Sequence, residues 1–248
     1  MKSNLIKVLK YTFVILFWLL VWHAAAEAVG NDYLLPSIKA TFKSLVEIFR
    51  DSKSYTKIVL TVFRVLYGFT LGCLLGVGLA VICSHFSFIY TLLNPIFTVI
   101  KSTPVASFII VLWVILSGDA VSIIIGIIMV LPIIWQNVLD GYKSIDPQLK
   151  EVSVIYKFGK FKTFKLLTFP AIKKYLVPAI ITSCGLCWKA EIAAEIIAYT
   201  DKSIGQSIRD AQIDDRPTVF AWTIIIITLS IVLEFATKKL LRRFTVND

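Results

Sequence analysis

The sequence has little of what an enzyme site needs. Its 248 residues include only two histidines, His23 and His85, and neither belongs to a metal-binding pattern such as HExxH. The phosphate-binding pattern GxxxxGK[ST] is absent as well. We therefore predict no catalytic residue, no metal site and no bound cofactor in this chain, and no ATP hydrolysis by it.

Cysteine is scarce too, and its positions argue against covalent cross-links. All four cysteines, Cys73, Cys83, Cys184 and Cys187, lie in apolar runs, where a thiol behaves as a small hydrophobic side chain. Cys184 and Cys187 form a CxxC, but no second Cys or His pair accompanies it to complete a zinc site. We expect all four side chains to contribute packing.

Charge is sparse and apolar side chains dominate. Hydrophobic residues make up 57% of the chain and charged residues 17%, and the mean hydropathy is +0.80. These values are typical of an integral membrane protein, and we predict one domain, residues 1–248. The net charge of +10 fits either a nucleic-acid surface or basic cytoplasmic loops. Because the lysines cluster between the apolar runs, the second explanation is favoured and no nucleic-acid partner is predicted.

The apolar runs predict an all-α, polytopic transmembrane helical bundle with about six spans. A hydrocarbon core of about 30 Å needs about 20 helical residues, and six runs have roughly that length. Lys101 and Pro104 interrupt the third run, which predicts a kinked span or an interfacial helix joined to a span. No convincing cleavage site precedes Glu27, so the first run is predicted to be an uncleaved span. The predicted spans are 11–29, 58–83, 88–116, 120–139, 173–198 and 218–237.

Basic residues that flank the runs predict the orientation in the membrane. They precede the first span and follow the last, which places both termini and the lysine-rich segment 140–174 in the cytoplasm. Segment 37–57 is the exception, because it lies outside with five basic and two acidic residues. Its apolar spacing at Ile38, Phe42 and Leu45 predicts an amphipathic helix on the outer surface. The flanking residues are Lys2, Lys7, Lys10, Lys238, Lys239, Arg242 and Arg243.

The segment EVSVIYKFGKFKTFKLLTFP, residues 151–170, places a basic and aromatic stretch between two spans. Val154, Phe158 and Phe161 recur at helical intervals, which predicts an amphipathic helical region ended by Pro170. Such a helix can rest on anionic lipid, with its lysines near the phosphates and its phenylalanines in the acyl boundary. It can equally be a docking surface for another protein, and periodicity leaves both readings open.

The spacing within this segment resembles the EAA loop, EAA-x3-G-x9-I-x-LP, of permease subunits of bacterial ABC importers. Glu151 and Pro170 coincide with the two ends of that pattern, and Lys157 stands at its glycine, two residues before Gly159. The resemblance implies cytoplasmic coupling helices, within a loop at 146–170, that sit in a cleft of a partner ATPase. The residues that it assigns to ATPase coupling are Glu151, Val152, Ser153, Lys157, Phe158, Gly159 and Pro170.

Further motifs follow in the order of the same family. TVFRVLYGF at 61–69 is similar to the S-x-x-R-x-x-x-G-F opening of a conserved span, and WKAEIAAEII at 188–197 is similar to a later stretch. With KSTP at 101–104 and LP at 131–132, these motifs resemble the nitrate, sulfonate and taurine type permeases. The resemblance covers nearly the whole chain but does not fix a substrate.

The resemblance also implies partners and a location. In this family two permease subunits, either two copies of one chain or a pair of paralogues, enclose a pathway in the bacterial cytoplasmic membrane. Two separate ATPase subunits bind ATP and Mg, and an extracytoplasmic binding protein delivers the solute. We therefore expect membrane lipid, an ATPase, a solute-binding protein and a second permease, most simply an identical copy, as partners.

Charged residues inside the fifth span are the other candidates for function. Charges at membrane depth cost at least ~2.5 kcal/mol each, so Lys189, Glu191 and Glu195 should face protein or water rather than lipid. With Trp188 they either line the translocation pathway or belong to a structural ion-pair network. If Glu191 faces the pathway, a cationic solute becomes easier to accept. Arg64, several residues inside the second span, predicts an interhelical salt bridge or a cluster of carbonyl groups around it.

The sequence leaves two alternative functions open. A secondary transporter or channel could use Lys189, Glu191 and Glu195 as a proton or ion relay, and a membrane scaffold would have no transport role. Asn137 and Gly141 are predicted to end the fourth span. Small-xxx-small spacing in the second span predicts close helix contact, within the chain or with a second copy. It involves Gly68, Gly72, Gly76 and Gly78.

Overall fold

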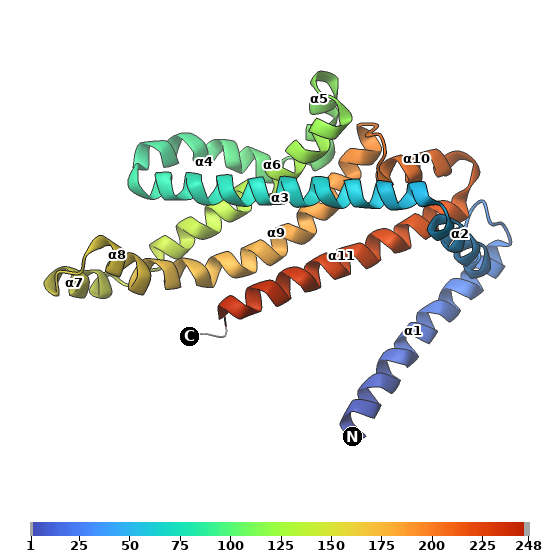
Figure 1. Cartoon of the computed structure of the whole chain (residues 1–248), viewed down its shortest axis with the longest axis horizontal. Coiled ribbons are helices and arrows are strands. Elements are labelled where there is room, and N and C mark those ends of the chain that lie inside the picture. The colour runs from blue at the N-terminus through green and yellow to red at the C-terminus, as the bar shows by residue number, and fades with distance from the viewer. Residues whose placement is uncertain (1, 246–248) are drawn as a thin grey trace.

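The structure, a computed structural model, describes residues 2–245 and is built of helices (Figure 1). No strand occurs within these residues, so the all-α prediction is confirmed. Residues 1 and 246–248, and the side chains of Lys2, Lys7 and Arg243, lie outside what it describes. In chain order the elements are α1 (Lys2–Val29), α2 (Ile38–Arg50), α3 (Ser52–His85), α4 (Ser87–Ser102), α5 (Val105–Ile115), α6 (Gly118–Lys143), α7 (Pro147–Ile155), α8 (Lys160–Thr163), the π-helical turn η1 (Phe164–Thr168), α9 (Phe169–Ile197), α10 (Ile204–Asp214) and α11 (Arg216–Thr245).

Five stretches of the described chain are helical, long and apolar enough to cross a membrane. They lie in α1, α3, α6, α11 and the continuous run from α8 to the end of α9. A sixth candidate is the pair α4 and α5, which meet at an angle of 105°. The third predicted span is therefore two helices rather than one straight helix. The break has a local cause, because Pro104 lacks an N–H and holds Thr103 in an extended conformation at ψ 135°.

The bundle centres on α3, α6 and α9, which run side by side (Figure 1). Glycines on α3 explain the close approach of α3 to α6. A Cβ atom at Gly72 would lie 2.7 Å from Cβ of Val130, and one at Gly76 would lie 2.9 Å from Cβ of Ile134. The small-xxx-small spacing thus serves helix contact within the chain, except at Gly78, where nothing lies within 4 Å.

The helix that contains the predicted fourth span, α6, ends at Lys143, two residues after Gly141. Where this span leaves the membrane stays a prediction. The amide of Asn137 donates to the Ile133 carbonyl 2.8 Å away, inside the same helix. A Cβ at Gly141 would lie 2.7 Å from Cα of Ile172, so this glycine lets α6 and α9 meet where they enter the loop between them.

The first two helices lie at the edge of the bundle. α1 projects away from the other helices and touches them near Trp22, whose ring stacks on Phe220 with centroids 6.1 Å apart (Figure 1). The predicted amphipathic helix of segment 37–57 is present as α2, which begins at the N-cap Ser37 and packs on α11. Ile48 of α2 is buried, whereas Phe42 remains exposed.

Candidate functional site

The residues of the predicted coupling loop lie together at one end of the molecule, between α6 and α9 (Figure 1). The C-terminal part of α11 points to the same end, and α2 and α10 lie at the other. Asp146 caps α7 by accepting a hydrogen bond from the Gln148 amide, 2.8 Å, and Pro147 opens the helix. The cap and the proline both lie in the sequence IDPQ, which sets where the first helix of the loop begins.

Within α7 the motif residues divide between a buried and an exposed face. Ser153 is buried, and its hydroxyl donates to the Lys150 carbonyl at 2.7 Å. Glu151 and Val152 are exposed. The helix ends in exposed apolar side chains, since Ile155 and Tyr156 keep more than two thirds of their surface accessible, 73% and 72%.

The chain turns sharply at Lys157. Its φ of 49° lies in the left-handed region, which favours glycine. The Phe158 amide donates to the Ser153 carbonyl at 2.8 Å, and the Lys157 amide donates to the Val154 carbonyl at 3.0 Å. This pair of bonds is the Schellman motif, whose left-handed residue is usually glycine. The turn therefore lies at the glycine position of the loop pattern, whereas Gly159 has an ordinary φ of −65°.

The predicted end of the helical region at Pro170 is wrong, whereas its division into two helices agrees with the coupling helices that the resemblance implies. The Schellman turn separates α7 from α8, and the helix that starts at Lys160 runs through Pro170 to Ile197. Proline is tolerated there because η1 relaxes the helix: the Phe169 amide bonds to the Phe164 carbonyl, five residues back, at the point where the proline N–H is missing. The loop is a helix, turn, helix unit.

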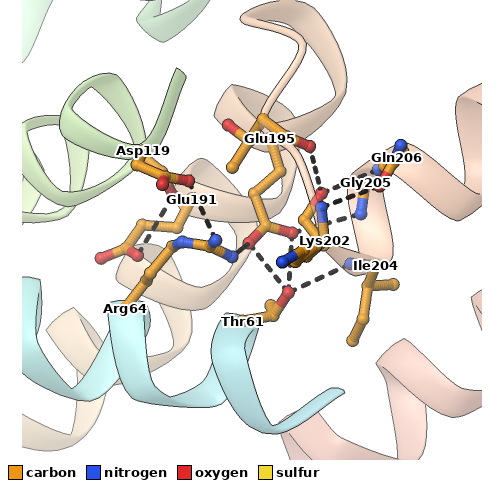
Figure 2. A network of polar contacts seen from close by, with 12 residues as sticks. Thr61, Arg64, Asp119, Glu191, Glu195, Lys202, Ile204, Gly205 and Gln206 are labelled. Atoms are coloured by element: carbon orange, nitrogen blue, oxygen red, sulfur yellow. Dashed lines mark hydrogen bonds and ion pairs between the residues drawn. The ribbon is translucent and has the colours of Figure 1, made fainter. Parts of the chain in front are cut away.

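A second cluster of motif residues forms a polar network (Figure 2), near the start of α6 and the end of α9 and so far along both helices from the loop. Arg64 of α3 bridges two helices: its Nη1 lies 3.3 Å from Oε1 of Glu195 on α9, and its Nη2 lies 2.9 Å from Oδ1 of Asp119 on α6. Arg64 also donates to the Asp201 carbonyl at 3.1 Å. The predicted interhelical salt bridge of Arg64 is confirmed.

Glu195 connects the network to the start of α10. It accepts hydrogen bonds from the Thr61 hydroxyl at 2.8 Å and from the Gly205 amide at 3.2 Å, while Thr61 in turn accepts from the Ile204 amide at 3.1 Å (Figure 2). A carboxylate at the first amides of a helix interacts favourably with the helix dipole. Glu195 is 1% exposed, so these bonds replace its lost hydration.

Glu191, one turn before Glu195, occupies a space made by two glycines. A Cβ at Gly126 of α6 would lie 1.8 Å from its Oε1, and a Cβ at Gly68 of α3 would lie 2.5 Å from the same atom. Cys187 donates to Oε1 at 3.3 Å, and Ser122 donates to Oε2 at 3.5 Å. The carboxyl group is fully buried where α3, α6 and α9 meet.

The four residues predicted to line a pathway therefore separate into two groups. Trp188, Glu191 and Glu195 are buried inside the subunit, at 1%, 0% and 1% exposure, whereas Lys189 is exposed. The charge of Glu195 is offset by Arg64 and not by Lys189. This arrangement matches the structural alternative for the two glutamates, and a pathway role for the four residues stays a prediction.

Two members of the network were not singled out from the sequence. Asp119 sits in the first turn of α6, which places it beside Arg64, but a lone aspartate between two apolar runs gives no signal of its partner. Thr61 lies one turn before Arg64 in the motif TVFRVLYGF, so helical periodicity could have found it on the same face.

Known proteins resemble this chain in sequence along most of its length. Residues 68–246 match the family of binding-protein-dependent transport system inner membrane components. The nitrate import permease protein NrtB of Synechocystis is 26% identical over 203 residues, covering 77% of this chain and 72% of that protein. The putative aliphatic sulfonates transport permease protein SsuC of Bacillus subtilis is 24% identical, covering 76% of this chain and 68% of that protein.

The fold is also similar to a solved structure. A crystal structure of an amino acid ABC transporter with histidines contains a chain with a TM-score of 0.60 and 16% sequence identity. The match covers 75% of this chain and 89% of that one. The helical bundle and the position of the loop between α6 and α9 are consistent with the family match. The chain belongs to the family of binding-protein-dependent transport system inner membrane components, the permease components of ABC importers.

Proposed function

We propose that this chain is the permease subunit of an ATP-driven importer that moves a small solute into the cytoplasm by alternating access. An extracytoplasmic binding protein delivers the solute, and separate ATPase subunits bind ATP and Mg. The observation that carries the proposal is the unit α7, Schellman turn and α8, which has the length and turn position of the EAA loop and joins α6 directly to α9.

The exposed side chains of this loop suit it to dock into a protein cleft. Ile155, Tyr156 and Phe161 are each more than 70% exposed, and lysines such as Lys157 and Lys160 lie between them. A combination of aromatic anchors and charges is typical of protein interfaces. A membrane surface would also accept such a face, so the ATPase assignment rests on the loop pattern together with the family.

The helices behind the loop can transmit its movement. α6 and α9 enter the loop in close contact at Gly141 and Ile172, and they remain in contact along the core. At the far end Glu195 and Asp119 join both helices to Arg64 of α3. Closely packed helices move together, so a displacement of the loop by an ATPase shifts the core of the subunit as a rigid body.

The remaining partners follow from the same proposal. The loop and the end of α11 lie on the cytoplasmic side, whereas α2 and α10 face the binding protein. A second permease, most simply an identical copy, encloses the pathway with this one. The relatives are named for nitrate and aliphatic sulfonates, which are both anions, and this favours a small anionic solute here.

Co-purification tests the proposal. The chain, expressed with candidate ATPase and solute-binding proteins from the same organism, should purify as a complex whose ATP hydrolysis rises with the loaded binding protein. Transport by liposomes that contain this chain alone, driven by a pH gradient, would instead establish the relay-based secondary transporter. The absence of both an ATPase partner and transport would leave a scaffold.

A further inference from the structure

We propose that Lys189 is an anion-attracting residue on the wall of the solute pathway, on a face of α9 that also carries Thr182 and Gly185. This inference rests on the proposed importer function. It names a helix face that lines the pathway and gives the sign of the charge on that face. It concerns the one of the four intramembrane candidates that the subunit does not bury.

The burial pattern of α9 isolates Lys189. Its neighbours in the chain, Trp188 and Ala190, are 1% and 6% exposed and face the core, whereas Lys189 points out of the subunit. At 1.5 Å per residue, Lys189 lies about 12 Å from the end of α9 at Ile197 and about 30 Å from its start at Phe169. A lysine at that depth normally faces water or protein, because lipid disfavours its charge.

The face around Lys189 is small and polar for a membrane helix. Thr182 is exposed two turns before it, and Leu186 and Ala193 are apolar residues of the face. A Cβ at Gly185 would meet nothing within 4 Å, so open space adjoins the helix one turn below Lys189. Small and hydroxyl side chains with free space beside them are suited to a passage for a hydrated solute.

The local charge on this surface is positive. Glu234 of α11, the exposed carboxylate near Lys189, forms its ion pair with Lys238 one turn along its own helix. The charge of Lys189 is therefore in excess on this surface and attracts anions. The carboxylate on this surface, Glu234, is paired with Lys238, and Glu191 and Glu195 lie inside the subunit, the latter bound to Arg64.

The exposed position of Lys189 and the buried position of Glu191 favour an anionic solute over a cationic one. A cationic solute was favoured only if Glu191 faced the pathway, and its carboxyl group is closed in by Gly68 and Gly126. The side chain that remains exposed on the same helix is a lysine. The solute class that fits it is a small anion such as a carboxylate, a sulfonate or an inorganic oxyanion.

Cysteine accessibility tests the wall and its charge without knowledge of the solute. The complex carrying Gly185→Cys, in proteoliposomes, is treated with an anionic reagent, sulfonatoethyl methanethiosulfonate, and a cationic one, trimethylammonioethyl methanethiosulfonate. The unsubstituted complex gives the background from the native cysteines. We expect both reagents to label Gly185→Cys, and we expect Ile231→Cys, on an exposed apolar face of α11, to remain unlabelled.

The ratio of the two labelling rates measures the charge. Gly185 and Lys189 are about 6 Å apart along the helix, where one charge in water changes each rate about three-fold in opposite directions. Adding Lys189→Gln should therefore lower the ratio of anionic to cationic labelling about ten-fold. Lys174→Gln, which removes a more distant lysine from the exposed side of the same helix, is the control and should leave the ratio unchanged.

Two results would overturn the proposal. If neither reagent reaches Gly185→Cys, this face contacts lipid or protein and is no pathway wall. If both react but Lys189→Gln leaves the ratio unchanged, Lys189 does not select by charge. ATP hydrolysis and ATPase content are measured on the same proteoliposomes, so a failure of the importer assignment is recognised separately from a failure of the lysine assignment.

Discussion

Glu195 of α9 and Arg64 of α3 meet inside the bundle, with Oε1 and Nη1 3.3 Å apart and both residues buried. Each of them has further partners on other elements, Asp119 of α6 for the arginine and the first amides of α10 for the glutamate. One ion pair therefore connects four helices. Removing Arg64 leaves the buried Glu195 without a cation, whereas removing Glu195 leaves Arg64 paired with Asp119.

Replacement of Arg64 should destabilise the subunit strongly. Arg64→Met leaves Glu195 as an uncompensated buried charge, which costs about 3–5 kcal/mol. We expect a large fall in the midpoint of thermal unfolding in detergent and a low yield of folded protein. Arg50→Met, at the exposed C-terminal end of α2, is the control and should change little. A stable Arg64→Met subunit would show that the network contributes nothing to stability.

Gly126 should be intolerant of even one methyl group. In Gly126→Ala the new Cβ would overlap Oε1 of Glu191, and this buried side chain, which α3 confines at Gly68, must move, so we expect a loss of about 1–3 kcal/mol by thermal unfolding. Gly185→Ala adds the same group to open space in a helix and should be neutral or stabilising by up to about 1 kcal/mol. Combining Gly126→Ala with Glu191→Ala removes the clash, and the pair should lose less than the sum of the single variants.

Lys157 should tolerate glycine better than any branched residue. A residue other than glycine in the left-handed region costs roughly 1–2 kcal/mol. Glycine avoids this cost, but part of the gain is offset because glycine loses more conformational freedom on folding. Lys157→Gly should therefore keep assembly with the ATPase and raise thermal stability by up to about 1 kcal/mol, whereas Lys157→Val should lower both. Gly159→Ala has an ordinary φ and free space, and should behave as the parent chain. Equal stability of all three variants would contradict the Schellman turn.

Reversal of charge at Glu151 should weaken the ATPase contact. Glu151→Lys adds positive charge to an already basic, exposed loop and leaves the spans untouched. We expect less ATPase to co-purify and slower ATP hydrolysis, with normal membrane insertion. Glu47→Lys makes the same change on the exposed face of α2, at the far end, and should keep the ATPase bound. Unchanged assembly and turnover of Glu151→Lys would remove this residue from the coupling site.

The loop pattern predicted two coupling helices in this segment, but periodicity did not locate the turn between them. The apolar spacing of Val154, Phe158 and Phe161 continues across the turn, since helical spacing can do so by chance. The left-handed residue that breaks the helix is a lysine, which carries no turn signal of its own. Pro170 is a signal for a helix end, but a π-helical turn accommodates it within the run from α8 to α9.

The sequence by itself determined the membrane class, the helical architecture and the family, because these depend on apolar run length, on charges between runs and on the spacing of short motifs. It also determined that Arg64 and the charges of α9 need protein partners, because lipid provides none. Only the tertiary structure decided which charges meet. Two residues apart on α9, Lys189 points outward and Glu191 points into a space left by glycines of α3 and α6. That difference arises because a helix turns 100° per residue, and its rotation in the bundle is set by packing against other helices.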